Sequence, residues 1–345
     1  MWINKQPILV GESTDNEKKL PLYDAPVKGL QYFVLETIFN EEKIKPWFFC
    51  NYIQLEYLPE GYIIFSMLQD YYAGYPFIDK QICTRDFISE ENVIEFLMRN
   101  IDMGWYTHLS LDEYYLPNKR AYQSYHYIHD SMVCGYNKSE KVIYMYGYSK
   151  ARKLEVSKVL FEEFQDAFEG VSLAENKLYN TMDYSNLIFM IRKNMTAQYE
   201  FDMDYMKKMI HDYLNGVPYT YQLRMYKNVE EQKIYGINIL QNLIEEFQNE
   251  HDIIKDYRPL TTIYEHSQIM LMRVNYLMEQ KYICSDEKFL QGFADIRDKT
   301  LKLRNLQLYY DHGRKEEVLR GVVAGIKEIS DLQNDFFINL LNQLG

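Results

Sequence analysis

A histidine-containing stretch supplies the side chains of this sequence that are best suited to acid–base catalysis. It begins with His126-Tyr-Ile-His129-Asp130 and leads into an apolar, β-branched run, a polar turn at 137–140 and a second apolar run at 142–146. This pattern predicts a β-hairpin with the histidines at its start. An imidazole held on a rigid sheet can act as a general base when a nucleophile lies opposite it. We therefore take His129 as the candidate base, with a packed strand histidine as the alternative.

The sequence indicates the carboxylate that orients this imidazole less clearly than it indicates the base. Asp112 ends a predicted strand over 105–111 close to the hairpin, so we take it as the third catalytic residue, with a plain turn or cap role as the alternative. Asp130 is the next candidate, but neighbours in a strand face opposite sides of the sheet. His126 lies three residues before His129, and we expect it to face the other side and to have a surface role.

The position best placed for a nucleophile lies at the start of an early helix. Apolar spacing over 27–40 predicts this helix, with Pro26 in its first turn and Asp24 as its N-cap. Backbone amides at such an end lower the pKa of a thiol or hold an oxyanion. The residue there is Ala25, which carries no thiol. Cys50, inside an apolar run, is the fallback nucleophile, although buried free cysteines are commonly inert.

Composition excludes several classes of function. Lys+Arg 38 against Asp+Glu 50 gives a net charge of -12, which disfavours a nucleic-acid interface. The four cysteines are scattered without a Cys-x-x-Cys pair, and neither a phosphate loop nor a His-Glu-x-x-His helix occurs, so we expect no bound metal or cofactor. No apolar run approaches the roughly 20 residues that span a bilayer, and a signal-peptide pattern is missing, so we expect a cytoplasmic location.

The spacing of apolar residues changes after the hairpin. Helical spacing of apolar residues begins near Val156 and recurs to the end of the sequence. We therefore place a domain boundary near Lys150, with one domain over 1–150 and an α-helical domain over 151–345. The sequence leaves open whether the helical domain forms a homodimer.

Short motifs then point to a family. The segments Ile101-Asp-Met-Gly104, Asp112-Glu-Tyr-Tyr-Leu-Pro117 and the histidine stretch with Gly135-Tyr136 resemble the N-terminal domain family of the butirosin-biosynthesis acyltransferase. These are papain-like or C39-like cysteine enzymes, cysteine protease homologues found in thiotemplated antibiotic clusters that include closthioamide-type ones. The helical half is similar to the extension of such homologues at Tyr235-Gly-Ile-Asn238 and Asp256-Tyr-Arg-Pro259. The resemblance implies an α+β fold: a papain-like N-terminal domain, with a helix packed on an antiparallel sheet, followed by an α-helical domain.

The family's chemistry is amide bond formation for antibiotic biosynthesis. A cysteine takes an acyl group from the phosphopantetheine thioester of an acyl or peptidyl carrier protein and passes it to a small amine, and the acidic composition here suits a polyamine. His129 matches the family's base, because it stands in His-x-x-x-Val-x-Gly-Tyr. The expected cysteine position holds Ala25. Either the chain is a non-catalytic paralogue or a cysteine was replaced, and the retained Asp24 and Pro26 favour replacement.

Two other functions stay open beside the acyltransferase. A chain without its nucleophile could dock carrier proteins, and a cysteine peptidase would share the same fold and chemistry. Tyrosines near the motifs could wall a substrate channel together with Asp24, or they could be core and rim packing: Tyr71, Tyr72, Tyr75, Tyr114 and Tyr115.

Overall fold

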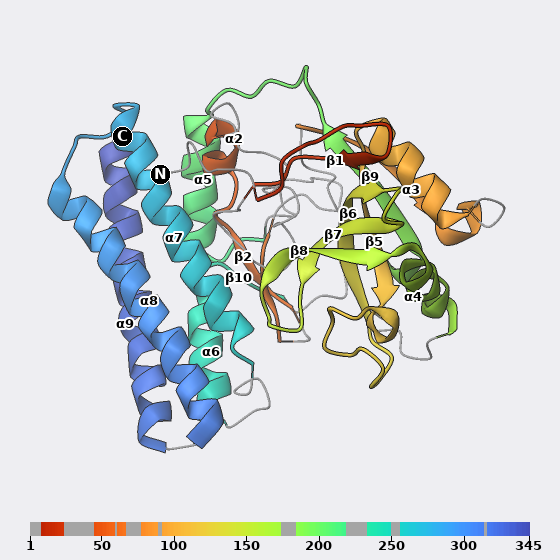
Figure 1. Cartoon of the computed structure of the whole chain (residues 1–345). Helices are drawn as coiled ribbons and strands as arrows, with labels where there is room; N and C mark the ends of the chain where they lie inside the picture. Colours follow the sequence, from red (N-terminus) through yellow and green to blue (C-terminus); the bar gives the residue numbers. More distant parts are fainter. Residues whose placement is uncertain are drawn as a thin grey trace. The chain divides into compact units, whose positions relative to one another are not determined.

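The computed structural model describes residues 8–23, 45–58, 61–66, 77–88, 92–173, 184–218, 233–249, 256–313 and 316–345 (Figure 1). Contacts divide the chain into two compact units. Of the described residues, the first unit holds 8–23 and 77–198, and the second holds 45–66 and 199–345. The fold is mixed α+β with antiparallel sheets, as the sequence predicted. No helix of the described ranges is both long and apolar enough to cross a membrane.

A seven-stranded antiparallel sheet forms the first unit, in the order β4-β9-β5-β6-β7-β8, with β1 also paired to β6. The strands are β1 (Glu17–Lys19), β4 (Ile78–Thr84), β5 (Tyr106–Asp112), β6 (Ile128–Asn137), β7 (Val142–Tyr148), β8 (Leu154–Leu160) and β9 (Leu187–Lys193). The predicted hairpin is confirmed as β6 and β7, with a bulge between Val133 and Gly135. The helices α3 (Val93–Asp102) and α4 (Phe161–Leu173) pack on this sheet and against each other.

The end of the first unit differs from the boundary expected near Lys150. The prediction of a helix from Val156 is wrong, because residues Leu154–Leu160 form β8, and α4 begins only at Phe161. β8 pairs with β7 along its whole length, and β9 pairs with β5. Residues after 150 therefore complete the same sheet, and the first unit continues to Gln198.

The second unit is mainly helical, in agreement with the spacing of its apolar residues. A small sheet of β10 (Ile234–Tyr235), β2 (Leu55–Tyr57) and β3 (Ile63–Phe65) accompanies the helices. The helices are α2 (Lys45–Cys50), α5 (Met203–Leu214), α6 (Asn238–Gln248), α7 (Arg258–Glu279), α8 (Glu287–Gly313) and α9 (Glu316–Leu344). α8 packs against both α7 and α9, and the three lie side by side in Figure 1.

Two buried polar side chains of α7 tie this helix to the segment around α2. Arg273 is completely buried, and its guanidinium donates to the carbonyl oxygens of Phe49, Asn51 and Tyr52 at 2.8, 3.1 and 3.0 Å. These carbonyls lie at and just after the end of α2, where a helix leaves its last acceptors without partners. His266 is equally buried, lies 2.8 Å from the Ile53 carbonyl through Nε2, and stacks on Tyr213.

The buried His266 predicts a pH-dependent stability. Burial, reinforced by the charge of Arg273, lowers the pKa of His266 from 6.5 to about 3. Below pH 6.5 the unfolded chain binds a proton that the folded chain does not. The free energy of unfolding should therefore fall by about 1.4 kcal/mol per pH unit from this residue. Urea unfolding between about pH 5 and 6.5 tests this prediction at pH values above those at which most carboxylates titrate.

The matched variants for this measurement are His266→Gln and His211→Gln. His211 is exposed on α5, so its replacement should leave the pH slope as it is. His266→Gln should make the slope shallower, because glutamine does not titrate. A His266→Gln protein with the slope of the unaltered chain would show that another group is responsible.

Candidate active site

An Asp–His pair lies where β5 ends and β6 begins. Asp112 is directly opposite Ile128 in the antiparallel register, and His126 precedes Ile128 by two residues. Residues in this diagonal relation share one face of a sheet. The Nδ1 atom of His126 lies 2.6 Å from Oδ2 of Asp112. The same relation joins His108 to Asp130, because His108 is opposite Met132, and their Nε2 and Oδ2 atoms are 2.7 Å apart.

Asp112 is held in place from several sides. Its side chain is completely buried, and Oδ1 accepts hydrogen bonds from the amides of Tyr114 and Tyr127 at 3.0 and 3.1 Å. Gly170 of α4 covers it so closely that a Cβ there would lie 3.1 Å from Oδ2 of Asp112. This glycine therefore permits the approach of the helix that shields the carboxylate from water.

His126 is accessible where Asp112 is not. Its side chain is 52% exposed, and the ring stacks on Tyr114 with centroids 4.4 Å apart. In the tautomer in which Nδ1 of His126 donates to Oδ2 of Asp112, Nε2 carries no proton and can accept one. A buried carboxylate behind an exposed imidazole is an arrangement suited to general-base catalysis.

His129 lies in a different environment. Its Nδ1 is 3.4 Å from Oε1 of Glu113, and its Nε2 is 3.7 Å from Oδ1 of Asp130. Burial opposes protonation of this ring, but the nearby carboxylates of Glu113 and Asp130 outweigh it and raise the pKa of His129 above 6.5. These contacts favour the protonated form of the ring, which suits a positioning role for His129 better than the role of a base.

The neighbouring carboxylates are stabilised in the ionised form. Burial alone would raise the pKa of Glu113, but His129 and Lys119 lower it, and Lys119 Nζ lies 3.3 Å from Oε1 of Glu113. Burial also opposes ionisation of Asp130, and the hydrogen bond with His108 outweighs it, so its pKa lies below the usual range. His129 thus sits between two carboxylates that are charged at neutral pH.

The structure does not pair Asp112 with His129, which differs from the arrangement expected from the sequence. His129 is opposite Leu111, and alternation puts it on the other face of the sheet from Asp112. Asp112 instead orients His126, the histidine for which we expected a surface role. The β5–β6 register would have revealed this pair, but the sequence alone does not give a register between separate strands.

The remaining predicted residues divide into two groups. Tyr114 and Tyr115 are within the site, with their rings beside His126. Four others, together with Tyr75, lie outside the described residues: Asp24, Ala25, Tyr71 and Tyr72. The fallback nucleophile Cys50 is buried, with Sγ 3.3 Å from the amide of Asp202, and burial raises the pKa of its thiol. This environment is that of an unreactive packing residue.

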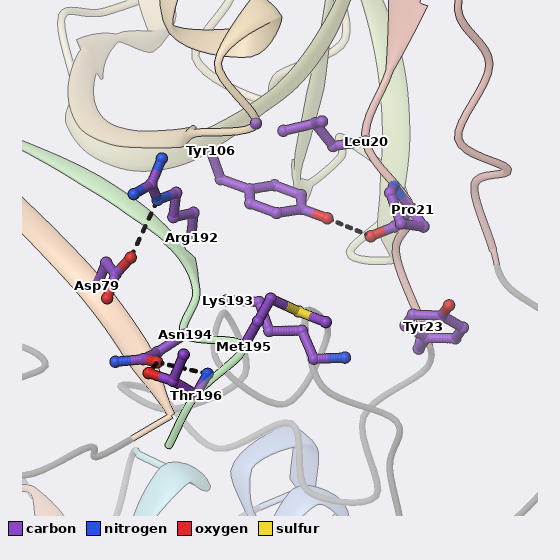
Figure 2. Close-up of a pocket in the computed structure, with 11 residues that line it drawn as sticks. Leu20, Pro21, Tyr23, Asp79, Tyr106, Arg192, Lys193, Asn194, Met195 and Thr196 are labelled. Atoms are coloured by element: carbon purple, nitrogen blue, oxygen red, sulfur yellow. Dashed lines mark hydrogen bonds and ion pairs between the residues drawn. The ribbon is translucent and has the colours of Figure 1, made fainter.

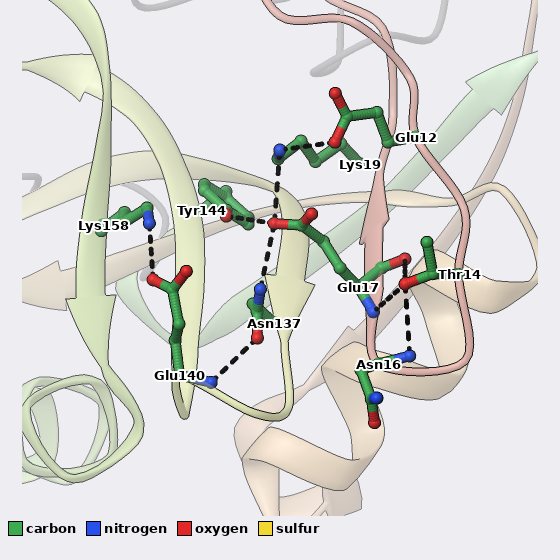
Figure 3. Close-up of polar contacts among 9 residues, drawn as sticks. All are labelled: Glu12, Thr14, Asn16, Glu17, Lys19, Asn137, Glu140, Tyr144 and Lys158. Carbon is green, nitrogen blue, oxygen red and sulfur yellow. Dashed lines mark hydrogen bonds and ion pairs between the residues drawn. The ribbon is translucent and has the colours of Figure 1, made fainter.

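The segment that leads toward position 25 is fixed by β1 (Figure 3). One carboxylate oxygen of Glu17 accepts from the Tyr144 hydroxyl, from Nδ2 of Asn137 at 3.1 Å and from Lys19 at 3.3 Å. These contacts, with the Tyr144 hydrogen bond as the largest, lower the pKa of Glu17 to about 2. Gly135 permits the close approach of β1, because a Cβ there would lie 2.6 Å from the Lys18 carbonyl oxygen.

β1 and β5 share one edge of β6. Lys19 is opposite Gly135, and the amide of Leu20 donates to the Cys134 carbonyl. Further along the same edge of β6, β5 is the pairing strand, beginning with Thr107 opposite Val133. The chain must therefore leave the edge after Leu20. The hydroxyl of Tyr106 donates to the carbonyl of Pro21 at 2.5 Å and holds the departing segment.

A cavity of about 600 Å³ lies beside this departure point (Figure 2). Leu20, Pro21 and Tyr23, the start of β5 and the end of β9 with residues 194–196 line it. Tyr106, at the start of β5, is a lining residue, whereas Asp112 ends the strand, about 20 Å away at 3.4 Å per residue. The first unit therefore offers two separate places for chemistry. Within the ranges described, no cluster of three or more His, Cys, Asp or Glu side chains is placed to hold a metal ion.

Comparison with known proteins adds no assignment: no family model matches the chain, and no curated protein matches it significantly.

Proposed function

We propose that this chain is an acyltransferase that moves an acyl group from a carrier-protein phosphopantetheine thioester to an amine and forms an amide. The observation that carries the proposal is the 2.6 Å contact between the buried carboxylate of Asp112 and the half-exposed ring of His126. Attack on a thioester requires a base because the attacking amine or thiol loses a proton. The resemblance supplies the donor and acceptor classes, and the Asp–His pair supplies the base.

The proton steps follow from the geometry. Nε2 of His126 removes a proton from the attacking group while that group forms its bond to the thioester carbon. Asp112 stabilises the resulting imidazolium. The tetrahedral intermediate then collapses, the carbon–sulfur bond breaks, and the imidazolium returns the proton to the departing thiolate. Tyr114 stacks on His126 and limits its rotation, so the base is already oriented when substrate arrives. His129, which lies between Glu113 and Asp130, acts in this proposal as a positioning residue.

Position 25 decides between two routes. Alanine has no nucleophilic atom, so the chain with Ala25 can only promote direct attack of the amine on the thioester. A cysteine at this position would add a covalent acyl-enzyme step. The proposal includes the papain-like arrangement, with the helix expected over 27–40 packed on the antiparallel sheet, and Asp24, Tyr71 and Tyr72 as further substrate contacts. A carrier protein as partner and a cytoplasmic location belong to the same proposal.

Intact-protein mass spectrometry of Ala25→Cys with an acyl-carrier thioester tests the proposal. We expect one acyl adduct that an added amine discharges as an amide. The Ala25 chain is the control, because it already contains the exposed Cys284 and reports acylation away from position 25.

Absence of the adduct, under conditions in which the carrier still binds, would contradict the acyltransferase and leave a carrier-docking protein as the better account. Discharge of the adduct by water but not by amine would instead indicate a peptidase or thioesterase. Both outcomes can be read from the same mass spectra.

A further inference from the structure

Exposed positive charges gather around the turn between β7 and β8, and we propose that they dock the acidic face of a carrier protein. This inference rests on the proposed function, because it names the surface that holds the donor of that reaction. Docking and chemistry can be measured separately, so either can fail without the other.

The turn lies at the same end of the sheet as the Asp112–His126 pair. β5, β6, β7 and β8 are successive antiparallel neighbours. The end of β5 at Asp112 therefore lies at the same side as the start of β6, the end of β7 and the start of β8. Because β6 alone separates β5 from β7, the turn and Asp112 are about 10 Å apart across the sheet, at about 4.8 Å per strand spacing.

A second segment, over 116–127, lies against this turn. The amide of Lys150 donates to the carbonyl of Asn118 at 2.8 Å, which joins the two segments. Within the turn itself, the amide of Ser149 donates to the carbonyl of Lys153 at 2.8 Å. Leu116 and Ala121 are buried and anchor the second segment. Both segments are thus held in fixed positions beside the candidate active site.

The two segments carry an excess of positive charge. Four exposed residues, which we call the basic surface, have no ion-pair partner within the described ranges: Arg120, Lys150, Arg152 and Lys153. Nearby carboxylates are already engaged, Glu113 with Lys119 at 3.3 Å and Asp130 with His108 at 2.7 Å. Glu155, exposed on β8, offsets only part of this charge.

An exposed tyrosine adds an apolar contact to the basic surface. Tyr125 is 54% exposed, lies edge-on to Tyr127 with ring centroids 6.3 Å apart, and directly precedes His126. Tyrosine and arginine are enriched in the centres of protein–protein interfaces. A nucleic acid would instead require a longer basic track. The combination therefore fits a folded protein with an acidic face.

The overall charge of the chain makes the basic surface important for orientation. The net charge is -12, so an acidic partner is repelled by the chain as a whole and attracted locally at the basic surface. A carrier protein docked there holds its phosphopantetheine thioester at the end of the sheet where His126 is accessible. The basic surface thus selects the orientation in which the donor can react.

Binding of an acidic carrier protein in its holo form, with phosphopantetheine but no acyl group, tests docking without any chemistry. Fluorescence anisotropy of the labelled carrier protein gives the Kd. Lys150→Glu/Lys153→Glu should weaken binding by about tenfold or more at about 0.1 M salt, because two attractions become repulsions, and the difference should shrink at higher salt. A carrier protein whose surface acids are changed to lysine should bind this variant more tightly than the original carrier protein does.

Lys80→Glu/Lys138→Glu is the matched control. It makes the same charge change at exposed positions toward the other end of the sheet, near the start of β4 and just after β6, and should leave binding nearly unchanged. With a short carrier-free thioester, both double variants should form amide at the rate of the unaltered chain. No amide from that substrate in any of these chains would contradict the proposed function, while carrier binding would still report on docking.

Three results would overturn the docking proposal. The first is that the unaltered chain does not bind the carrier protein. The second is that the two double variants bind it equally well. The third is that a single-stranded oligonucleotide binds the unaltered chain as tightly as the carrier protein does, which would indicate a nucleic-acid surface instead.

Discussion

Replacing His126 by alanine should slow amide formation by direct attack of the amine by about a thousandfold, the middle of the range for loss of a general base. The reason is that the half-exposed imidazole, oriented by the buried Asp112, is the group placed to take the proton from the attacking amine. Single-turnover rates with an acyl-carrier thioester measure this loss directly.

The matched comparison is His129→Ala in the same chain. His129 contacts two carboxylates and has a raised pKa, so its loss should disturb the charge balance and cost about tenfold or less in rate. His211→Ala, at an exposed position of α5, should have no effect. A larger loss for His129→Ala than for His126→Ala would make His129 the base, as its position in the family motif suggested.

Arg273→Met should lower the free energy of unfolding by about 3–5 kcal/mol, because it removes a buried charge that satisfies several buried acceptors. The guanidinium is the donor to the carbonyls of Phe49, Asn51 and Tyr52, and methionine fills a similar volume without donating. Burial lowers the pKa of Arg273 to about 9, so the side chain remains charged at neutral pH. Urea unfolding at pH 7 gives the measurement.

Arg320→Met is the control for this stability effect. Arg320 is exposed on α9, and its replacement should change the free energy of unfolding by about 0.5 kcal/mol or less. Arg273→Lys should recover only part of the loss, because an ammonium group lacks the planar fork that reaches three carbonyls. A loss below about 1 kcal/mol for Arg273→Met would show that these carbonyls find other donors.

The local sequence pattern predicted those elements in which apolar residues alternate strictly or recur with helical spacing. The β6–β7 hairpin and the helices of the second unit follow from side chains that repeat every two or every 3.6 residues. Pattern failed at β8, where Val156, Val159 and Leu160 fit a helix as well as a strand. There the pairing with β7 decided the outcome, and pairing is a tertiary interaction that a short apolar run does not encode.

The site was predictable in its residue types but not in its pairs. The sequence named Asp112 and His129 as catalytic candidates and gave His126 a surface role. Which histidine contacts the carboxylate depends on the β5–β6 register, because a shift of one residue moves a side chain to the other face of the sheet. The cavity was not predicted, because its lining joins Leu20, Pro21 and Tyr23 to residues 192–196. Arg273 was missed because its carbonyl partners are more than two hundred residues away in sequence.

A double-mutant cycle on Asp112 and His126 tests the central claim most directly. Rates of amide formation by the unaltered chain are compared with those of Asp112→Asn, His126→Ala and the double variant. If the carboxylate acts only through the imidazole, Asp112→Asn slows the reaction, and the double variant is no slower than His126→Ala alone. Losses that multiply in the double variant, or a His126→Ala chain that forms amide as fast as its parent, would contradict the account.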